Sequence, residues 1–271
     1  HIDKSERFSW FMIGGTTGWI VAGLMVGFFF GEKDGAFFYL AAGAQAVLAV
    51  YCLTLPHTPP RGAGKEGRDI FGLTAVKLLK DPAFLVFAVS IPLVTISKTF
   101  YTTWTNAFLA EIKMPKPTAL MTLCQVSELL TMIVLPWFIA KLGLKRILMI
   151  GMAVWALRFF AFGSMHGPVV IAGLLLHGLS YGLVVTGASI YAARLVPPAM
   201  SARAQSFISM LIFGVGMFLG AQLAGFVGDA YRGEGGRLHD WTAIWGWGAV
   251  IALAACILFG IGGKDPKAVE A

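Results

Sequence analysis

The chain contains few charged residues and few cysteines. Asp, Glu, Lys and Arg make up 13% of its 271 residues, about half of the ~25% usual in soluble domains. Its three cysteines, Cys52, Cys124 and Cys256, lie in or beside apolar runs without metal-ligand or paired spacing, so we interpret them as small core residues. The five histidines are scattered, and no nucleophile elbow or phosphate-binding glycine loop occurs. These absences exclude a soluble domain and predict no metal, no cofactor and no enzyme activity.

Most of the chain consists of long apolar runs. Hydrophobic residues make up 57% of the chain, and a run of about 20 residues spans the hydrocarbon core of a bilayer. Such runs occur at Phe8–Phe30, Phe37–Leu55, Phe84–Leu109, Ala119–Leu142, Ile147–Gly163, Val169–Tyr191, Ser206–Val227 and Ala243–Gly263. They are continuous rather than alternating, which favours helices over a β-barrel. The predicted fold class is all-α, a polytopic helix bundle in the lipid bilayer.

The formal net charge of +7 indicates membrane orientation rather than nucleic-acid binding. If the spans alternate, most Lys and Arg residues fall on one side, as in Lys141–Arg146, and few fall on the other, as with Lys113 and Lys116. The positive-inside rule then places both termini of this chain in the cytoplasm. We therefore expect a membrane partner and no nucleic-acid partner.

One connection is long, polar and rich in Pro and Gly. It covers residues 57–82 and begins His57-Thr-Pro-Pro-Arg-Gly. This composition is typical of a linker between helix bundles. The linker separates two spans in residues 1–56 from six spans in residues 83–271.

Three ionisable residues, Lys98, Glu128 and Arg158, lie deep within predicted spans. Counted at about 1.5 Å per residue from the cytoplasmic ends, all three fall in one layer near the bilayer midplane. A charge there costs at least about 2.5–3.5 kcal/mol, and secondary transporters bind solutes and ions at this depth. Two alternatives stay open: the charges pair with one another to hold helices in register, or Lys98 extends toward an interface.

Gln125 lies one helical turn before Glu128, so an amide and a carboxylate share one face of a helix. Together they offer donors and acceptors that suit a polyhydroxylated or amide-bearing solute. We therefore predict that both residues bind solute.

The preceding span adds Thr99, Thr102 and Asn106 together with the aromatic Tyr101. Threonines in membrane helices often bond only their own backbone, and aromatics near the ends of spans often form an interfacial belt. Because these residues neighbour Lys98 and lie opposite the Gln125 face, we predict that they also line the solute site.

Short motifs are the most specific signal in the chain. The strongest are Cys124-Gln-Val-Ser-Glu128, Leu135-Pro-Trp-Phe138, Gly143-Leu-Lys-Arg146 and Trp155-Ala-Leu-Arg-Phe159. They follow, nearly residue for residue, the pattern S-Q-x-S-E, P-x-F, G-x-K and W-x-x-R-F of the nucleoside:proton symporters of the major facilitator superfamily. With weaker matches such as Gly15-Thr-Thr-Gly-Trp-Ile20, essentially the whole chain resembles this family.

The resemblance implies which residues contact solute. In the family, the Gln and Glu of S-Q-x-S-E line the nucleoside site, and here they are Gln125 and Glu128. The aromatic residue that closes the G-T-x-G motif is retained as Trp19, and we expect Trp19 or Tyr101 to cover an apolar or ring face of the solute. Where family members can have Gln and Asn, this chain has Thr99 and Thr102.

Two positions depart from the family pattern. The family usually has an Arg three residues before the glycine that opens G-T-x-G, and Met12 stands there. An acidic residue that commonly follows H-G-x-x-Y, tied to proton coupling, is replaced by Gly182. Glu128 is then the best remaining proton acceptor.

The family fold has twelve helices in two halves around a cavity, and this chain resembles helices five to twelve. Residues 1–56 then correspond to the last two helices of the N-terminal half, 57–82 to the inter-half loop and 83–271 to the C-terminal half. The resemblance implies a monomeric, multi-pass protein of the bacterial inner membrane, of which this chain is a partial major facilitator fold. Its expected function is uptake of a nucleoside-like solute with a proton by alternating access. The alternative is a non-transporting receptor or degenerate paralogue of the same fold.

Overall fold

The chain is helical throughout the residues that the structure describes. The structure is a computed structural model that describes residues 5–30, 35–57, 76–197, 200–233 and 238–266. The helices are α1 (Ser5–Phe29), α2 (Ala36–Cys52), α4 (Pro82–Glu111), α5 (Pro117–Leu142), α6 (Leu144–Gly163), α7 (Gly167–Leu175), α8 (His177–Tyr181), α9 (Gly187–Leu195), α10 (Ser201–Ser209), α11 (Met217–Ala230) and α12 (Trp241–Gly262). No strand occurs in these ranges, and the predicted all-α class is confirmed.

Two helical rods contain a π-helical turn. The rod Gly167–Leu195 runs through α7 and α8, then the π turn η2 (Gly182–Thr186), and ends with α9. The rod Ser201–Ala230 joins α10 and α11 through the π turn η4 (Met210–Gly216). A short 3₁₀ turn, η1 (Lys77–Lys80), precedes α4. A π turn adds a residue to the helical turn and changes the direction of the side chains beside it.

Six helices in the described part are long and apolar enough to cross a membrane. They are α4, α5, α6, the two rods and α12, and they coincide with the last six predicted spans. α4 begins at Pro82, where the missing N–H costs nothing, and Asp81 accepts a hydrogen bond of 2.9 Å from the Phe84 N–H.

The first predicted span forms a helix of 25 residues, α1, whereas the second is shorter than predicted. α2 has 17 residues, and the apolar part of α1 with described side chains is Gly14–Phe29. At 1.5 Å per residue, α2 is about 26 Å long, less than the ~30 Å hydrocarbon core. The predicted span ran to Leu55, but the chain turns after Cys52. Of the eight or so expected transmembrane helices, six are thus long and apolar enough within the described residues, and the side chains of α1 before Gly14 lie outside them.

The core lies among α4, α6 and α12 and consists largely of aromatic rings. Phe159 stacks on Trp245 with centroids 5.4 Å apart, and Phe108 meets the edges of Trp241 and Trp245 at 5.3 Å. Each such ring pair contributes about 0.5–1.5 kcal/mol beyond the area that it buries. This core fixes the helices that carry the site.

Small residues bring α4 and the α10–α11 rod together. A Cβ added to Gly220 would lie 2.6 Å from Thr99 Oγ1, and one added to Gly216 would lie 2.8 Å from Thr95 Cβ. The spacing Gly216-x-x-x-Gly220 predicts such a contact, and the structure confirms it.

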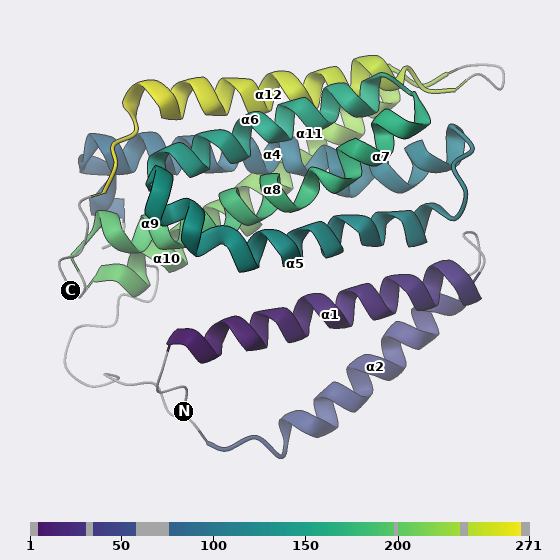
Figure 1. Cartoon of the computed structure of the whole chain (residues 1–271), viewed down its shortest axis with the longest axis horizontal. Coiled ribbons are helices and arrows are strands. Elements are labelled where there is room, and N and C mark those ends of the chain that lie inside the picture. Colours follow the sequence, from purple (N-terminus) through teal and green to yellow (C-terminus); the bar gives the residue numbers. More distant parts are fainter. Residues whose placement is uncertain (1–4, 31–34, 58–75, 198–199, 234–237, 267–271) are drawn as a thin grey trace.

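α1 packs along α5 at the side of the six-helix bundle, and α2 lies beyond α1 (Figure 1). A Cβ on Gly27 would lie 2.7 Å from the backbone N of Ala119, so these helices approach closely. No residue of α2 is buried, and Cys52 is exposed, whereas Cys124 is buried and Cys256 is partly buried. The interpretation of Cys52 as a core residue was wrong, because no described element covers α2.

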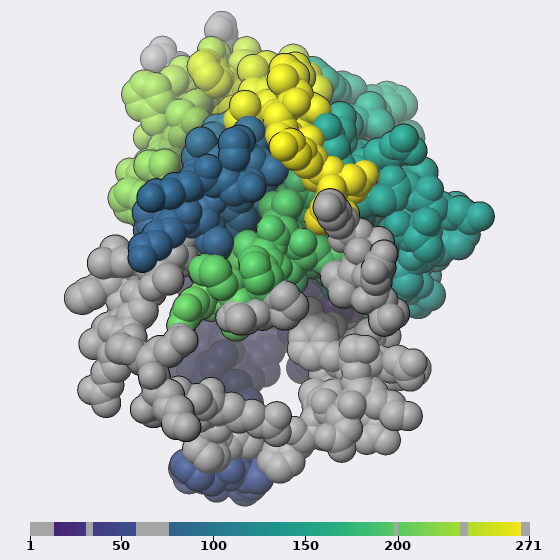
Figure 2. Space-filling view, turned by 90° about the vertical axis from the view of Figure 1, so that its left-hand side faces the viewer, coloured from purple at the N-terminus to yellow at the C-terminus, as the bar shows by residue number. Residues whose placement is uncertain are grey.

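Seen end-on, the start of α4 (blue), the α9 and α10 region (green) and the end of α12 (yellow) gather at one end of the bundle (Figure 2). Residues 76–82, the described end of the predicted linker, lead into α4, and residues 58–75 lie outside the described residues.

Candidate solute-binding site

Gln125 and Glu128 lie one turn apart on α5, and both side chains are partly buried. The Glu128 side chain is 12% exposed. Within the described part of the chain, neither its carboxylate nor the Gln125 amide takes part in a hydrogen bond. Both groups keep their full capacity to bond a ligand.

His177, at the start of α8, connects the two charges on α5 and α6. Its Nε2 lies 3.9 Å from Glu128 Oε2, and its Nδ1 lies 2.9 Å from Arg158 Nη1. Arg158 is fully buried and also donates from Nε to the Gly173 carbonyl at 3.3 Å. The predicted midplane charges Glu128 and Arg158 are therefore linked through a histidine instead of by direct contact.

Aromatic faces surround the buried guanidinium. Arg158 Cζ lies 4.3 Å from the Tyr101 ring centroid and 4.6 Å from that of Trp155. The Tyr101 ring is buried and lies 4.9 Å from the His177 ring. Its hydroxyl and the Arg158 Nη2 have no hydrogen-bond partner among the described residues. Tyr101 thus supports Arg158 and His177 from inside the bundle and does not lie on an open surface.

Lys98 reaches the same region from α4. Its Nζ lies 5.3 Å from the Tyr181 ring centroid and 5.9 Å from that of Phe213. The ammonium is near enough to Glu128 for their charges to interact, although no ion pair within 4 Å joins them in the described structure. Lys98 therefore stays at the level of Glu128 instead of extending to an interface. Tyr181 precedes η2 and Phe213 lies in η4, so both π turns adjoin this lysine.

A close approach of α5 and α8 sets the distance between Glu128 and His177. The Gly178 N–H donates to Ser127 Oγ at 2.9 Å. A Cβ on Gly178 would overlap the Ser127 carbonyl, so only glycine fits there with this backbone. Ser127 and Gly178 thus hold Glu128 and His177 side by side.

The structure does not bring Thr99, Thr102 and Asn106 to Glu128. Thr99 is buried against Gly220 and donates to the Thr95 carbonyl, and Thr102 is exposed and donates to the Thr99 carbonyl. Asn106 is exposed and donates to Thr118 Oγ1 at 3.0 Å. Both threonines thus bond their own helix.

Trp19 lies on α1 and is 68% exposed. Cβ atoms added to Gly23 and Gly27 would meet Thr122 and Ala119, so α1 and α5 run antiparallel. Continued by one turn, this register places Trp19 at the level of Gln125. Its ring is available to a ligand on that side of α5.

His177 and Tyr181 were missed in the sequence analysis. Both lie in a predicted span, and a histidine inside a membrane span is itself a sign of function. That signal was present, since His177 opens the His-Gly-Leu-Ser-Tyr-Gly stretch.

Gly182 packs against α5 one turn after Gly178. A Cβ at Gly182 would lie 2.9 Å from Thr131 Cγ2. Any side chain at this position would require Thr131 to shift, so the observed helix contact favours glycine.

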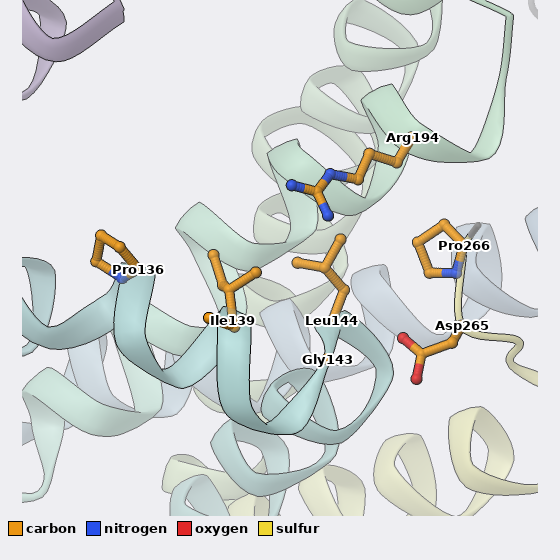
Figure 3. Close-up of a pocket in the computed structure, with 8 residues that line it drawn as sticks. Pro136, Ile139, Gly143, Leu144, Arg194, Asp265 and Pro266 are labelled. Carbon is orange, nitrogen blue, oxygen red and sulfur yellow. The ribbon is translucent and has the colours of Figure 1, made fainter. Parts of the chain in front are cut away.

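A separate cavity of about 580 Å³ lies near the end of the bundle where α5 meets α6. Figure 3 shows Arg194 and Asp265 at its wall with Pro136, Ile139 and Leu144. Asp265 accepts a hydrogen bond of 3.0 Å from the Lys145 N–H and so caps α6. The cavity contains neither Gln125 nor Glu128, and we place the candidate site at Glu128 because the unbonded polar groups are there. The described residues contain no group of His, Cys, Asp or Glu that could hold a metal ion.

Comparison with known families now identifies the chain. The family model described as nucleoside H⁺ symporter matches residues 2–268. The chain belongs to the nucleoside H⁺ symporter family. The predicted membership is confirmed.

Two relatives of this chain come from Escherichia coli (strain K12). The putative nucleoside transporter YegT is 34% identical over 275 residues, which cover 95% of this chain and 65% of YegT. The nucleoside permease NupG is 28% identical over 268 residues, which cover 91% of this chain and 64% of NupG. The chain thus spans slightly less than two thirds of the length of these relatives.

Solved structures agree with the fold of the symporter family. A crystal structure of a point mutant of the nucleoside transporter NupG matches with a TM-score of 0.83 at 25% identity. The match covers 93% of this chain and 66% of that one. A second NupG crystal structure gives a TM-score of 0.79. The relatives are transporters and permeases, as predicted, and do not favour an enzyme or a receptor.

Proposed function

We propose that the full-length protein takes up nucleosides together with protons and that this chain supplies one wall of its cavity. The proposal rests on one observation: the Glu128 carboxylate lies near Lys98 inside a membrane helix and has no hydrogen bond in the described structure. An acid kept there at such cost is expected to bind a solute or a proton. The names of the relatives support nucleosides as the solute class.

Glu128 and Gln125 would bond the polar edge of the nucleoside. An ionised carboxylate accepts two hydroxyl hydrogens, as a ribose diol offers, and the Gln amide both donates and accepts, as a nucleobase requires. Trp19, exposed at the level of Gln125, would cover a ring face. Thr102 and Asn106 are exposed on α4 and remain candidates for the outer part of the site. The buried Thr99 and Tyr101 would act only through packing.

Glu128 would also be the group that takes up the proton. When it is ionised, Lys98 balances its charge, and when it is protonated the carboxyl group becomes a hydrogen-bond donor. A solute and a proton that bind at one side chain are coupled, because each changes the affinity for the other. Arg158 would keep its place beneath the site in both states.

We further propose the arrangement of the whole protein. Residues 1–56 would complete an N-terminal half that continues upstream, and residues 83–271 would form the C-terminal half, joined by a cytoplasmic loop at 57–82. The excess of Lys and Arg on one side supports cytoplasmic termini in a bacterial inner membrane. The site then needs both halves, and the protein would work as a monomer.

Uptake of a labelled nucleoside by the full-length protein tests this proposal. Wild type should accumulate nucleoside when an inward proton gradient is imposed, and Glu128→Gln should lose about 10- to 100-fold of that uptake, as expected for lost charge-assisted hydrogen bonds. The control is Asp229→Asn, the same change of carboxylate to amide at an exposed residue of α11, which should transport normally. Full gradient-driven uptake by Glu128→Gln would remove Glu128 from the mechanism.

A further inference from the structure

His177 is a buried ionisable residue that the proposed transport scheme has not used. Its side chain is 4% exposed, and each ring nitrogen faces a charged group. Nδ1 lies 2.9 Å from Arg158 Nη1, and Nε2 lies 3.9 Å from Glu128 Oε2. The ring therefore lies between Arg158 on α6 and Glu128 on α5.

The contact with Arg158 determines the tautomer of His177. A guanidinium group carries only hydrogen-bond donors. At 2.9 Å from Arg158 Nη1, His177 Nδ1 must accept, so it carries a lone pair and no hydrogen. The single ring hydrogen of a neutral imidazole is then on Nε2, the nitrogen that faces Glu128.

Protonation of His177 would break this arrangement. An imidazolium ring carries an N–H at both nitrogens, which would set the Nδ1–H against the Arg158 N–H. Arg158 has little freedom to move away, because it is fully buried, bonds the Gly173 carbonyl and lies between the Tyr101 and Trp155 rings. The ring is held on its other side by Tyr181, which stacks on it at 5.3 Å.

The other titratable or charged groups around the ring leave this assignment intact. They are Lys98 and Tyr101 on α4, Glu128 on α5, Arg158 on α6 and Tyr181 on α8. Glu128 is the one carboxylate in this set, and it faces Nε2 rather than Nδ1.

We infer that Arg158 fixes His177 as a neutral Nε2–H donor that orients the Glu128 carboxylate, so His177 is a positioning residue and not a proton carrier. The inference rests on the proposed function for the meaning of Glu128, but the tautomer itself does not. The gap of 3.9 Å is longer than a hydrogen bond, so the Glu128 side chain would have to rotate toward Nε2 to accept from it. The histidine would then orient the carboxylate when solute binds.

The first test reads the tautomer directly. Nitrogen NMR of the full-length protein labelled at histidine, with the His177 signal assigned by its loss in His177→Gln, should show the neutral Nε2–H form between about pH 5 and pH 8, where a free histidine changes charge. His166 is exposed and supplies the reference signal. An Nδ1–H tautomer, or an imidazolium signal within this range, would overturn the inference.

The second test asks whether His177 acts through Glu128. In His177→Asn, the amide oxygen can replace Nδ1 as the acceptor for Arg158, but no donor reaches Glu128. In His177→Gln, the longer side chain can place a donor where Nε2 was. Nucleoside affinity of the purified protein should fall about tenfold in His177→Asn, the loss of roughly one hydrogen bond to a charged group, and be largely restored in His177→Gln.

The background Glu128→Gln supplies the matched control. If His177 acts through Glu128, then His177→Asn should change affinity little in that background. An equal, additive loss in both backgrounds would mean that His177 has only a structural role and would overturn the inference. If the wild-type protein binds no nucleoside at all, the proposed function fails, and the NMR experiment still decides the tautomer.

Discussion

The described part of the bundle contains two glutamate–histidine pairs, and they are built in opposite ways. At the C-terminal end of α4, Glu111 accepts three hydrogen bonds, from His239 Nδ1 at 2.7 Å, the His239 N–H at 3.1 Å and Trp241 Nε1 at 3.0 Å. At the level of Lys98, the Glu128 carboxylate accepts none within the described structure, and His177 Nε2 lies 3.9 Å away.

This difference indicates that Glu111 stabilises the fold, whereas Glu128 is available for binding. Glu111 ties the end of α4 to the start of α12, and its oxygens are already satisfied. Glu128 is more deeply buried, with a side chain 12% exposed against 28% for Glu111, yet it is the less bonded of the two. A buried acid without bonds lowers stability, and it is expected where function requires it.

The largest effect should come from separating His177 from Glu128. In Gly178→Ala, the new methyl group would overlap the Ser127 carbonyl and push α8 away from α5, so His177 would leave Glu128. We expect little folded protein and no uptake. The control is Gly246→Ala, where a Cβ meets nothing within 4 Å and folding should be unchanged. Normal expression and uptake by Gly178→Ala would show that the close contact of α5 and α8 does not set the site.

A smaller effect should distinguish the two acids in thermal unfolding, because the Tm should fall in Glu111→Gln and not in Glu128→Gln. Glu111→Gln loses charge-assisted hydrogen bonds and should lower the free energy of unfolding by about 1–2 kcal/mol, a Tm decrease of a few degrees. Glu128→Gln has no such bonds to lose and removes a charge from the membrane interior, so its Tm should not fall. The two variants are compared in the same detergent. If both lose stability equally, Glu128 is a structural acid like Glu111.

Much of this architecture follows from the sequence. Continuous apolar runs predict the six long helices, and counting residues from their ends places Lys98, Glu128 and Arg158 in one layer. Helical spacing puts Gln125 and Glu128 on one face, because that relation depends only on the geometry of their own helix.

The contacts between helices were harder to predict. Thr99 lies against Gly220 and Tyr101 lies beneath Arg158, so neither faces the open side of α5. Periodicity defines the faces of a helix but not the neighbour that covers each face. His177 was overlooked for the same reason, since its importance comes from two partners on other helices. The length of α2 was overestimated because Leu53 and Leu55 are apolar but belong to a turn.

Proton movement during transport tests the central claim most directly. The full-length protein is placed in vesicles that contain a pH-sensitive dye, and nucleoside is added outside without an imposed gradient. Wild type and Glu111→Gln should carry protons inward with the nucleoside and acidify the vesicles, whereas Glu128→Gln should give no nucleoside-dependent acidification. Acidification by Glu128→Gln at the wild-type rate would contradict the assignment of Glu128 as the acid that binds the proton.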